Sequence, residues 1–200
     1  MSLPRSTGQR AGLTRDQILA AGRAILADGG LEALTMRALA VRLGVRPNAL
    51  YSHVASKTAL VEELLDDVLA EVRAPTADTP DWQDGLHALM ASSHEVLLAH
   101  PDLVPLYLGR GARGENAQRL GGVVLALLAR GGITGPPARE ALRVLIVFAI
   151  GFAAFVTQPG FERDDDDPEA RHAELVANFD RGLGWLLAGI AGRGTKPTIL

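Results

Sequence analysis

The sequence predicts an all-α protein. Hydrophobic residues make up 48% of its 200 residues, whereas aromatic residues make up only 4%. Ala, Leu, Val and Gly dominate, and few segments alternate between apolar and polar residues as a half-buried strand would. A chain of this length can bury a substantial core in one or two compact units.

The first predicted helix begins after Thr14. Thr14 and Gln17 have the spacing of a capping box, and Asp16 suits the positive end of a helix. The run Asp-Gly-Gly at 28–30 ends this helix, because glycine is a poor helix former. The buried face consists of Ile18, Gly22, Ile25 and Leu26.

Two short helices joined by a tight turn come next. Leu39 and Leu43 are spaced for one buried stripe, which predicts the first helix over residues 36–43. Gly44 suits its C-terminal end, because only glycine enters the left-handed conformation without steric cost. Pro47 suits the first turn of the second helix, where its missing N–H would be unpaired anyway.

This arrangement is typical of a helix-turn-helix, whose second helix can enter the major groove of DNA. Arginine suits guanine, asparagine suits adenine, and an alanine methyl can contact thymine. Residues 1–60 hold eight Lys or Arg and three Asp or Glu (8 − 3 = +5), while residues 61–200 hold twelve and twenty (12 − 20 = −8). The basic N-terminal region therefore favours a surface that binds a polyanion such as DNA. The outward side of the second helix carries Arg46, Asn48, Ala49, Ser52 and His53.

The segment LTMRALAVRLGVRPNALYSHVASKTAL resembles the DNA-binding helices of the tetracycline-repressor family of bacterial transcriptional regulators. The resemblance covers roughly residues 13–72. It implies that Arg46, Asn48, Ala49 and Ser52 read base edges, with Pro47 on the same surface. An alternative for Tyr51 is a core residue whose hydroxyl reaches the rim. The phosphate contacts that the resemblance implies are Thr35, Arg37, Tyr51, His53 and Lys57.

The rest of the chain predicts further helices. Ser56 caps one whose other face, Glu62, Glu63, Asp66 and Asp67, reads as a solvated surface rather than a metal or acid-base site. The helix predicted over 136–157 is apolar on all sides, so it is buried in a core or at a subunit interface. Its longest apolar run spans 13 residues (Val144 to Val156), too few to cross a membrane. The remaining predicted helices are 81–100, a short turn of helix over 101–108, 116–129 and 169–190.

This part resembles, more loosely, the C-terminal effector domain of the same family, through His100-Pro101, Asn116, Gly151-Phe152 and Phe179 with Gly182-Leu183. In that family the domain binds a small molecule and forms a homodimer through its last long helices. The resemblance implies a DNA-binding domain over 13–60 and an effector-binding and dimerisation domain over 61–200. It also implies a cytoplasmic repressor that binds a near-palindromic double-stranded DNA operator.

A mostly apolar effector is expected, because no cluster of Lys or Arg falls in this region. Possible apolar walls are Met90, Phe148, Phe152 and Phe155, and possible polar groups are His87, His94 and Tyr107. For His94 the alternative is a satisfied core or surface histidine. The expected dimer interface consists of Leu142, Ile146, Phe179, Leu183 and Leu186.

Other functions find little support in the sequence. The chain has no cysteine and no H-E-x-x-H motif, and His87, His94 and His100 lack the spacing of a helical metal pair. The G-x-G-x-x-G match at 109–114 follows no strand, so it does not indicate a nucleotide site. We expect no metal, no cofactor and no enzymatic activity. The alternatives are a dimeric structural DNA-binding protein without a ligand, or a helical enzyme. The four aspartates at 164–167 predict a solvated loop.

Overall fold

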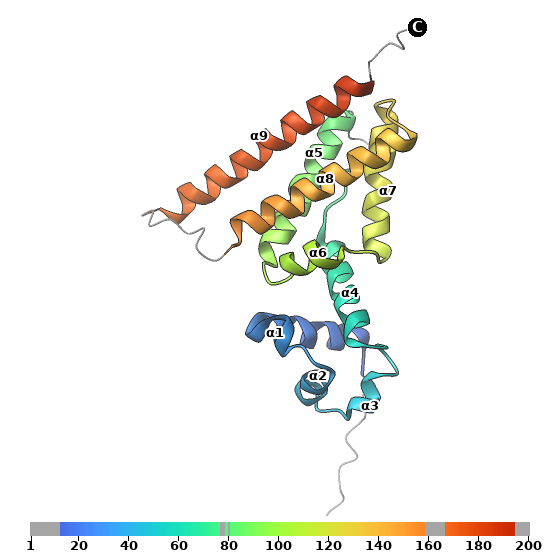
Figure 1. The fold of residues 1–200 in the computed structure, drawn as a ribbon, viewed down its shortest axis with the longest axis vertical. Helices are drawn as coiled ribbons and strands as arrows, with labels where there is room; N and C mark the ends of the chain where they lie inside the picture. The colour runs from blue at the N-terminus through green and yellow to red at the C-terminus, as the bar shows by residue number, and fades with distance from the viewer. Residues whose placement is uncertain (1–12, 77–78, 80, 159–166, 195–200) are drawn as a thin grey trace, which may run out of the picture. The chain divides into compact units, whose positions relative to one another are not determined.

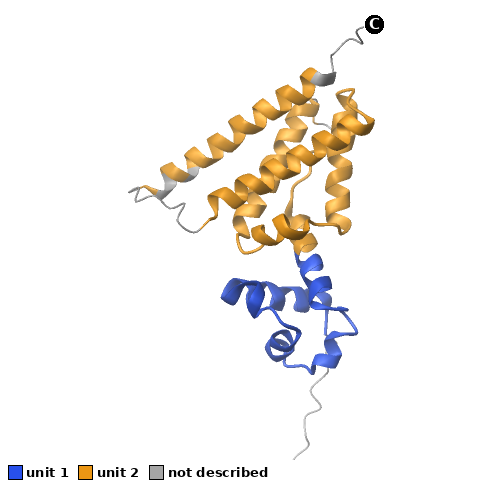
Figure 2. Cartoon of the chain, viewed as in Figure 1, with its two compact units in different colours: residues 1–64 blue, residues 65–200 orange. Residues whose placement is uncertain are grey.

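The structure is a computed structural model that describes residues 13–76, 79, 81–158 and 167–194. All regular secondary structure in these residues is helical, which confirms the predicted all-α fold (Figure 1). The chain divides between Leu64 and Leu65 into two compact units, which Figure 2 shows in blue and orange. Of the predicted acidic loop, residues 164–166 lie outside the described residues.

The first unit contains α1 (Arg15–Ala33), α2 (Met36–Leu43), α3 (Pro47–Leu50) and most of α4 (Lys57–Val68). The capping box at the start of α1 is complete: Gln17 N–H donates to Thr14 Oγ1 at 3.2 Å, and Thr14 N–H donates to Gln17 Oε1 at 3.0 Å. The helical conformation of α1 breaks at Gly30, where φ is 69°. α1 packs on α2, and their side chains bury the core residues Ile18, Leu19, Leu26 and Leu39.

The turn between α2 and α3 follows the prediction. Gly44 adopts the left-handed conformation with φ 65°, and Pro47 occupies the first turn of α3. α3 is a single helical turn, shorter than the second helix of the sequence prediction. The chain beyond it stays tight, because the N–H groups of His53 and Val54 both donate to the Leu50 carbonyl at 2.9 Å.

The second unit contains η1 (Leu69–Glu71), α5 (Trp82–Ala99), α6 (Val104–Arg110), α7 (Glu115–Arg130), α8 (Gly135–Val156) and α9 (Pro168–Gly194). α8 contacts α5, α6, α7 and α9, so it is the central helix of this unit. Leu145, Ala149 and Ala153 form its buried stripe. Of the helices in the described residues, none combines the length and the apolarity that crossing a membrane requires.

In the single chain α8 is buried on one side only, so of the two predicted alternatives burial in a core does not account for all its apolar residues, and burial at a subunit interface stays a prediction. Val147 is 69% exposed and Phe155 is 57% exposed, although Leu145 between them in sequence is fully buried. The carboxylate face predicted for α4 is also only partly solvated, because Asp66 is 7% exposed. The burial of Asp66 arises from residues of α7, a distant part of the chain.

Candidate DNA-binding surface and effector cavity

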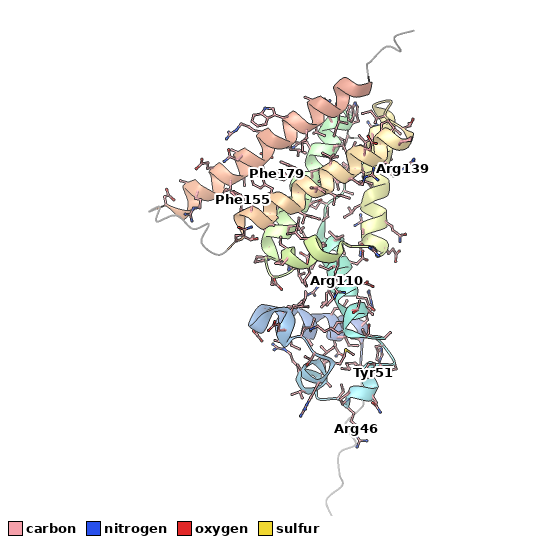
Figure 3. All side chains as sticks on the ribbon, in the orientation of Figure 1. Arg46, Tyr51, Arg110, Arg139, Phe155 and Phe179 are labelled. Atoms are coloured by element: carbon pink, nitrogen blue, oxygen red, sulfur yellow. The ribbon has the colours of Figure 1, made fainter. Side chains whose placement is uncertain are left out.

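The residues predicted to contact DNA form one exposed surface around α2 and α3, here called the DNA-binding surface. Figure 3 shows Arg46 and Tyr51 beside α3. Tyr51 is 53% exposed, so the alternative of a core tyrosine is wrong. Lys57 is half-buried. The exposed members of the surface are Thr35, Arg37, Arg46, Pro47, Asn48, Ala49, Tyr51, Ser52 and His53.

Short-range hydrogen bonds fix this surface. Thr35 Oγ1 accepts from Ala38 N–H at 3.0 Å and so caps α2, while its own hydroxyl proton can still be donated. Ser52 Oγ donates to the Ala49 carbonyl at 2.8 Å. These bonds hold the outward side chains on a rigid turn, as a base-reading surface requires.

The cationic side chains of the first unit differ in whether they are bonded within the protein. Arg42 pairs with Asp28 at 2.8 Å, and Lys57 Nζ donates to the Leu31 carbonyl at 2.7 Å. Within the described part of the chain no ion pair is found for Arg37 or Arg46, so both guanidinium groups can bind phosphate or bases. An ammonium group has three donors, and Lys57 therefore keeps two for a phosphate.

The second unit contains a cavity of about 220 Å³ between α5, α7 and α8. Of the residues predicted to bind a ligand, Met90 and Tyr107 line it. Leu142 and Ile146, which were predicted for the dimer interface, also line it. No charged side chain does. The remaining lining residues are Leu69, Leu89, Ser93, Leu97, Gly111, Ala112, Ala117, Leu120, Gly121, Val124, Ala149 and Ile150.

The two hydroxyl groups in the wall are already donors within the protein. Tyr107 donates to the Leu65 carbonyl, and Ser93 donates to the Leu89 carbonyl at 2.8 Å. Burial raises the pKa of the Tyr107 phenol, and the negative charges of Asp66 and Glu71 raise it further. The phenol therefore stays neutral near pH 7. Each hydroxyl oxygen can still accept a hydrogen bond from a guest.

Three predicted ligand residues lie instead in an aromatic cluster between α5, α8 and α9. His94 stacks on Phe179 with ring centres 4.0 Å apart, and its edge meets Phe152 at 5.3 Å. Phe148 lies 5.1 Å from Phe179. His94 is 3% exposed, so it follows the alternative of a core histidine. None of these side chains lines the cavity of about 220 Å³, and His94 and Phe179 line a separate hollow between α5 and α9.

The other two predicted ligand residues lie at the surface. His87 Nε2 approaches Asp180 Oδ1 at 3.5 Å, between α5 and α9, and its side chain is 39% exposed. Phe155 is 57% exposed on α8 (Figure 3). The helical period explains these positions, because one face of α5 or α8 meets the cavity and another meets α9 or solvent.

The predicted interface residues also divide. Phe179 and Leu183 are 1% and 0% exposed, so they belong to the core of this chain and offer no surface to a second copy. Leu186 lines a groove of about 500 Å³ between α8 and α9, together with Val144 and Trp185. Sequence reasoning missed Trp185, which is 76% exposed. The available signal was a tryptophan in the last predicted helix, outside its buried stripe of Phe179 and Leu183.

The described residues contain no group of three or more His, Cys, Asp or Glu side chains that could hold a metal ion.

Comparison with known proteins assigns both units to one family. Residues 18–64 match the model of bacterial regulatory proteins of the tetR family, and residues 74–182 match the tetracyclin repressor-like C-terminal domain. The chain belongs to the tetracycline-repressor family. The chain is thus a transcriptional regulator rather than an enzyme, as the sequence predicted.

The individual relatives agree. An HTH-type transcriptional regulator of Saccharopolyspora erythraea is 32% identical over 203 residues, covering 90% of this chain and 85% of the relative. The class A tetracycline repressor protein of Escherichia coli is 32% identical, covering 90% and 92%. ActR of Streptomyces coelicolor, solved in complex with actinorhodin, superposes with a TM-score of 0.77 at 26% identity, covering 93% and 100%.

Proposed function

We propose that the protein is a homodimeric repressor that a small, uncharged and mostly apolar molecule releases from a near-palindromic operator. Each chain presents one DNA-binding surface, and a two-fold axis would place two of them in successive major grooves. The observation that carries this proposal is the cavity, since its apolar wall is separate from the DNA-binding surface. Because the proposed target is operator DNA, we expect the repressor to act in the cytoplasm.

The wall defines the ligand class. It contains no Lys, Arg, Asp, Glu or His, so a charged guest would lose its hydration without gaining a partner. Its polar side chains are those of Ser93 and Tyr107, whose hydroxyl oxygens suit one or two donor groups on an otherwise apolar body. The volume lies below the roughly 300–1,000 Å³ of pockets for drug-sized molecules, so the guest is small. ActR was solved with actinorhodin, which supports a small-molecule effector in a similar fold.

The dimer is supported by an outer face on α8 and α9, defined by Val144, Val147, Phe155 and Trp185. These side chains are between 46% and 76% exposed in the single chain. Large contiguous apolar surfaces on soluble proteins indicate interaction sites. A stable dimer of this kind buries upwards of about 2,000 Å². Burying this face against a second copy would remove it from water.

Release of the operator follows from linkage. A ligand shifts the protein between two states by the ratio of its affinities for them. The same factor must apply in reverse, so operator DNA should weaken ligand binding equally. A ligand that prefers the state with the wrong spacing between DNA-binding surfaces would therefore relieve repression.

The cavity can be tested by filling it. Gly121 lines the cavity, and a Cβ placed there would meet only Leu142 Cδ2, at 3.9 Å. Gly121→Leu should therefore enter the cavity without displacing backbone. Gly122 is exposed on the same helix and has no neighbour within 4 Å, so Gly122→Leu is the matched control.

Wild-type protein should be screened by thermal shift against naphthalene, indole, cyclohexanol and benzyl alcohol, and the hits tested for release of a selected operator fragment. Gly121→Leu should abolish the shift and the release, while Gly122→Leu keeps both. Equal responses in both variants would move the ligand site elsewhere. Operator binding by the wild type without release by any panel molecule or larger apolar compound would favour the structural DNA-binding alternative.

A further inference from the structure

The last turn of α4 is bonded to the first turn of α7 through Asp66. Its Oδ1 accepts from Ala117 N–H at 2.9 Å, and its Oδ2 accepts from Asn116 N–H at 3.1 Å. Asn116 Nδ2 donates back to the Asp66 carbonyl at 3.2 Å and lies 3.3 Å from Oδ2. Asp66 therefore caps a helix that begins about fifty residues later, and its charge faces the positive end of that helix.

Gly114 provides the space for this contact. A Cβ at that position would lie 2.2 Å from Asp66 Cγ and 2.5 Å from Oδ2. Its φ of −74° is open to any residue, so the requirement is for clearance rather than for a special backbone conformation. Any side chain at 114 would push the carboxylate away from the α7 N-terminus.

The same turn of α4 is bonded to the cavity wall. The Tyr107 hydroxyl donates to the carbonyl of Leu65, the residue before Asp66, and Tyr107 is 4% exposed. Tyr107 and Ala117 both line the cavity. Figure 1 shows α6 and the start of α7 beside the end of α4. Two bonds to the end of α4 therefore come from residues that line the cavity.

α4 also belongs to both units. Its residues 57–64 fall in the first unit, and Leu65 begins the second. Whatever fixes residues 65 and 66 thereby fixes the end of a helix whose beginning lies beside the DNA-binding surface. Lys57, at its first turn, donates to the Leu31 carbonyl.

We propose that Asp66 is a positioning residue: with Asn116, Ala117 and Tyr107 it forms a latch that holds α4 in the arrangement that binds operator. This inference rests on the proposed function and specifies its regulation. A guest that displaces Tyr107 or the first turn of α7 loosens the latch and lowers operator affinity. The latch neither touches DNA nor supplies the wall with a charge, so it acts through α4.

The buried setting makes the latch two-state rather than gradual. A carboxylate at 7% exposure cannot replace two lost N–H partners with water without moving, and an unpaired buried charge is strongly unfavourable. The bonds therefore break together with a displacement of α4 or α7. Packed interfaces of this kind amplify small movements in a ligand site.

The test compares Asp66→Asn with Asn116→Ala, and Glu62→Gln serves as the control for loss of one negative charge on α4. Operator affinity is measured without ligand by fluorescence anisotropy, and stoichiometric titration gives the active fraction of each preparation. Asp66→Asn should bind operator about tenfold more weakly, within the range typical of coupling between sites. Asn116→Ala should weaken it less, and the double variant should lose less than the product of the two, because both break one contact.

Amide hydrogen exchange at Ala117 reports the latch directly and should be faster in Asp66→Asn than in Glu62→Gln. If Asp66→Asn and Asn116→Ala bind operator as tightly as Glu62→Gln does, Asp66 is only a helix cap and the proposal is wrong. If Asp66→Asn does not fold, Gly114→Ala decides, since its Cβ would displace the Asp66 carboxylate from the start of α7; wild-type operator affinity in Gly114→Ala then contradicts the latch. The release ratio is the operator affinity without ligand divided by the affinity with ligand. For the panel molecule that best releases the operator from the wild type, this ratio should be closer to one in Asp66→Asn. An unchanged ratio also contradicts the latch.

Failure of the proposed function looks different. If no panel molecule releases the wild type, the ligand response fails, and the ligand-free affinities still decide the latch. If the wild type selects no operator from random DNA, repression itself fails in the parent protein, and the latch, which holds α4 for operator binding, fails with it. A failure confined to the variants leaves DNA binding by the wild type intact.

Discussion

The exposed turn around α2 and α3 and the contacts of the cavity wall with the end of α4 are held by hydrogen bonds of different range, although Lys57 bonds Leu31 over 26 positions and Ser93 bonds Leu89 over four. On the DNA-binding surface the bond from Ala38 to Thr35 and the bond from Ser52 to Ala49 each join residues three positions apart. At the cavity, the bond from Tyr107 to Leu65 spans 42 positions, and the bonds from Asn116 to Asp66 span 50. A surface held by short-range bonds keeps its shape when its helices move as a body, whereas the shape of the cavity changes when one helix shifts against another.

This difference suits the two tasks. Base reading needs side chains on a rigid support, and a ligand response needs packing that can adopt two arrangements. Substitutions in the first unit should therefore act where they are made. The effect of a substitution in the second unit should instead extend to the several helices that pack on α8. Substitutions in the two units can therefore test this contrast.

The second unit should distinguish sharply between its core and its outer face. Leu183→Asp places a charge at a fully buried position and should abolish cooperative folding of the unit, since losses above about 4–5 kcal/mol are typical of such changes. Val147→Asp adds the same charge at a position that is 69% exposed, so it should keep helical content while dissociating the dimer. Circular dichroism and sedimentation velocity measure the two properties. A dimeric Val147→Asp variant would contradict the proposed outer face.

A local change on the DNA-binding surface should have a smaller and narrower effect. Arg46→Ala should cost roughly 1–3 kcal/mol at one base pair of the operator, because a guanidinium that reads a base edge contributes only there. Arg42→Ala is the control, since Arg42 is exposed but paired with Asp28. Competition assays against every single-base variant of the operator measure the pattern. Uniform weakening by Arg46→Ala would show that it binds phosphate instead.

The same contrast explains which features could be predicted from the sequence. The capping box of Thr14 and Gln17, the left-handed Gly44 and the position of Pro47 all depend on neighbours within a few residues. Their chemistry is visible in a short window. The exposed side chains around α3 follow from the same local geometry, so the candidate DNA-binding residues could be named without the fold.

Features that depend on distant partners could not be predicted. Asp66 reads as one carboxylate of a solvated face, because nothing near it in sequence indicates that the start of α7 will accept it. Gly114 reads as part of a flexible loop for the same reason. Phe148 and Phe152 suit a ligand wall by composition, yet they meet Phe179 from another helix. Composition predicts an apolar interior without saying which apolar residues surround the empty space.

The smallest predicted effect compares two aspartates. Asp28 pairs with Arg42 across α1 and α2, but their side chains are 68% and 44% exposed. Exposed ion pairs contribute about 0–1 kcal/mol and are screened by salt. Asp28→Asn should therefore lower the free energy of unfolding by less than about 1 kcal/mol, and the loss should shrink at 1 M NaCl. Asp66→Asn makes the same chemical change at a buried site, so its effect should be larger and nearly independent of salt.

Chemical denaturation with urea at low and high salt measures both variants, because urea adds no ions of its own. Asp28→Asn should also leave Arg42 unpaired, so operator affinity at low salt should rise slightly as a further cation becomes available to phosphates. Equal stability losses for the two variants at both salt concentrations would remove the contrast between a local, solvated surface and a buried, long-range one. In that case Asp66 would be no more than a surface cap, and the cavity would need another connection to α4.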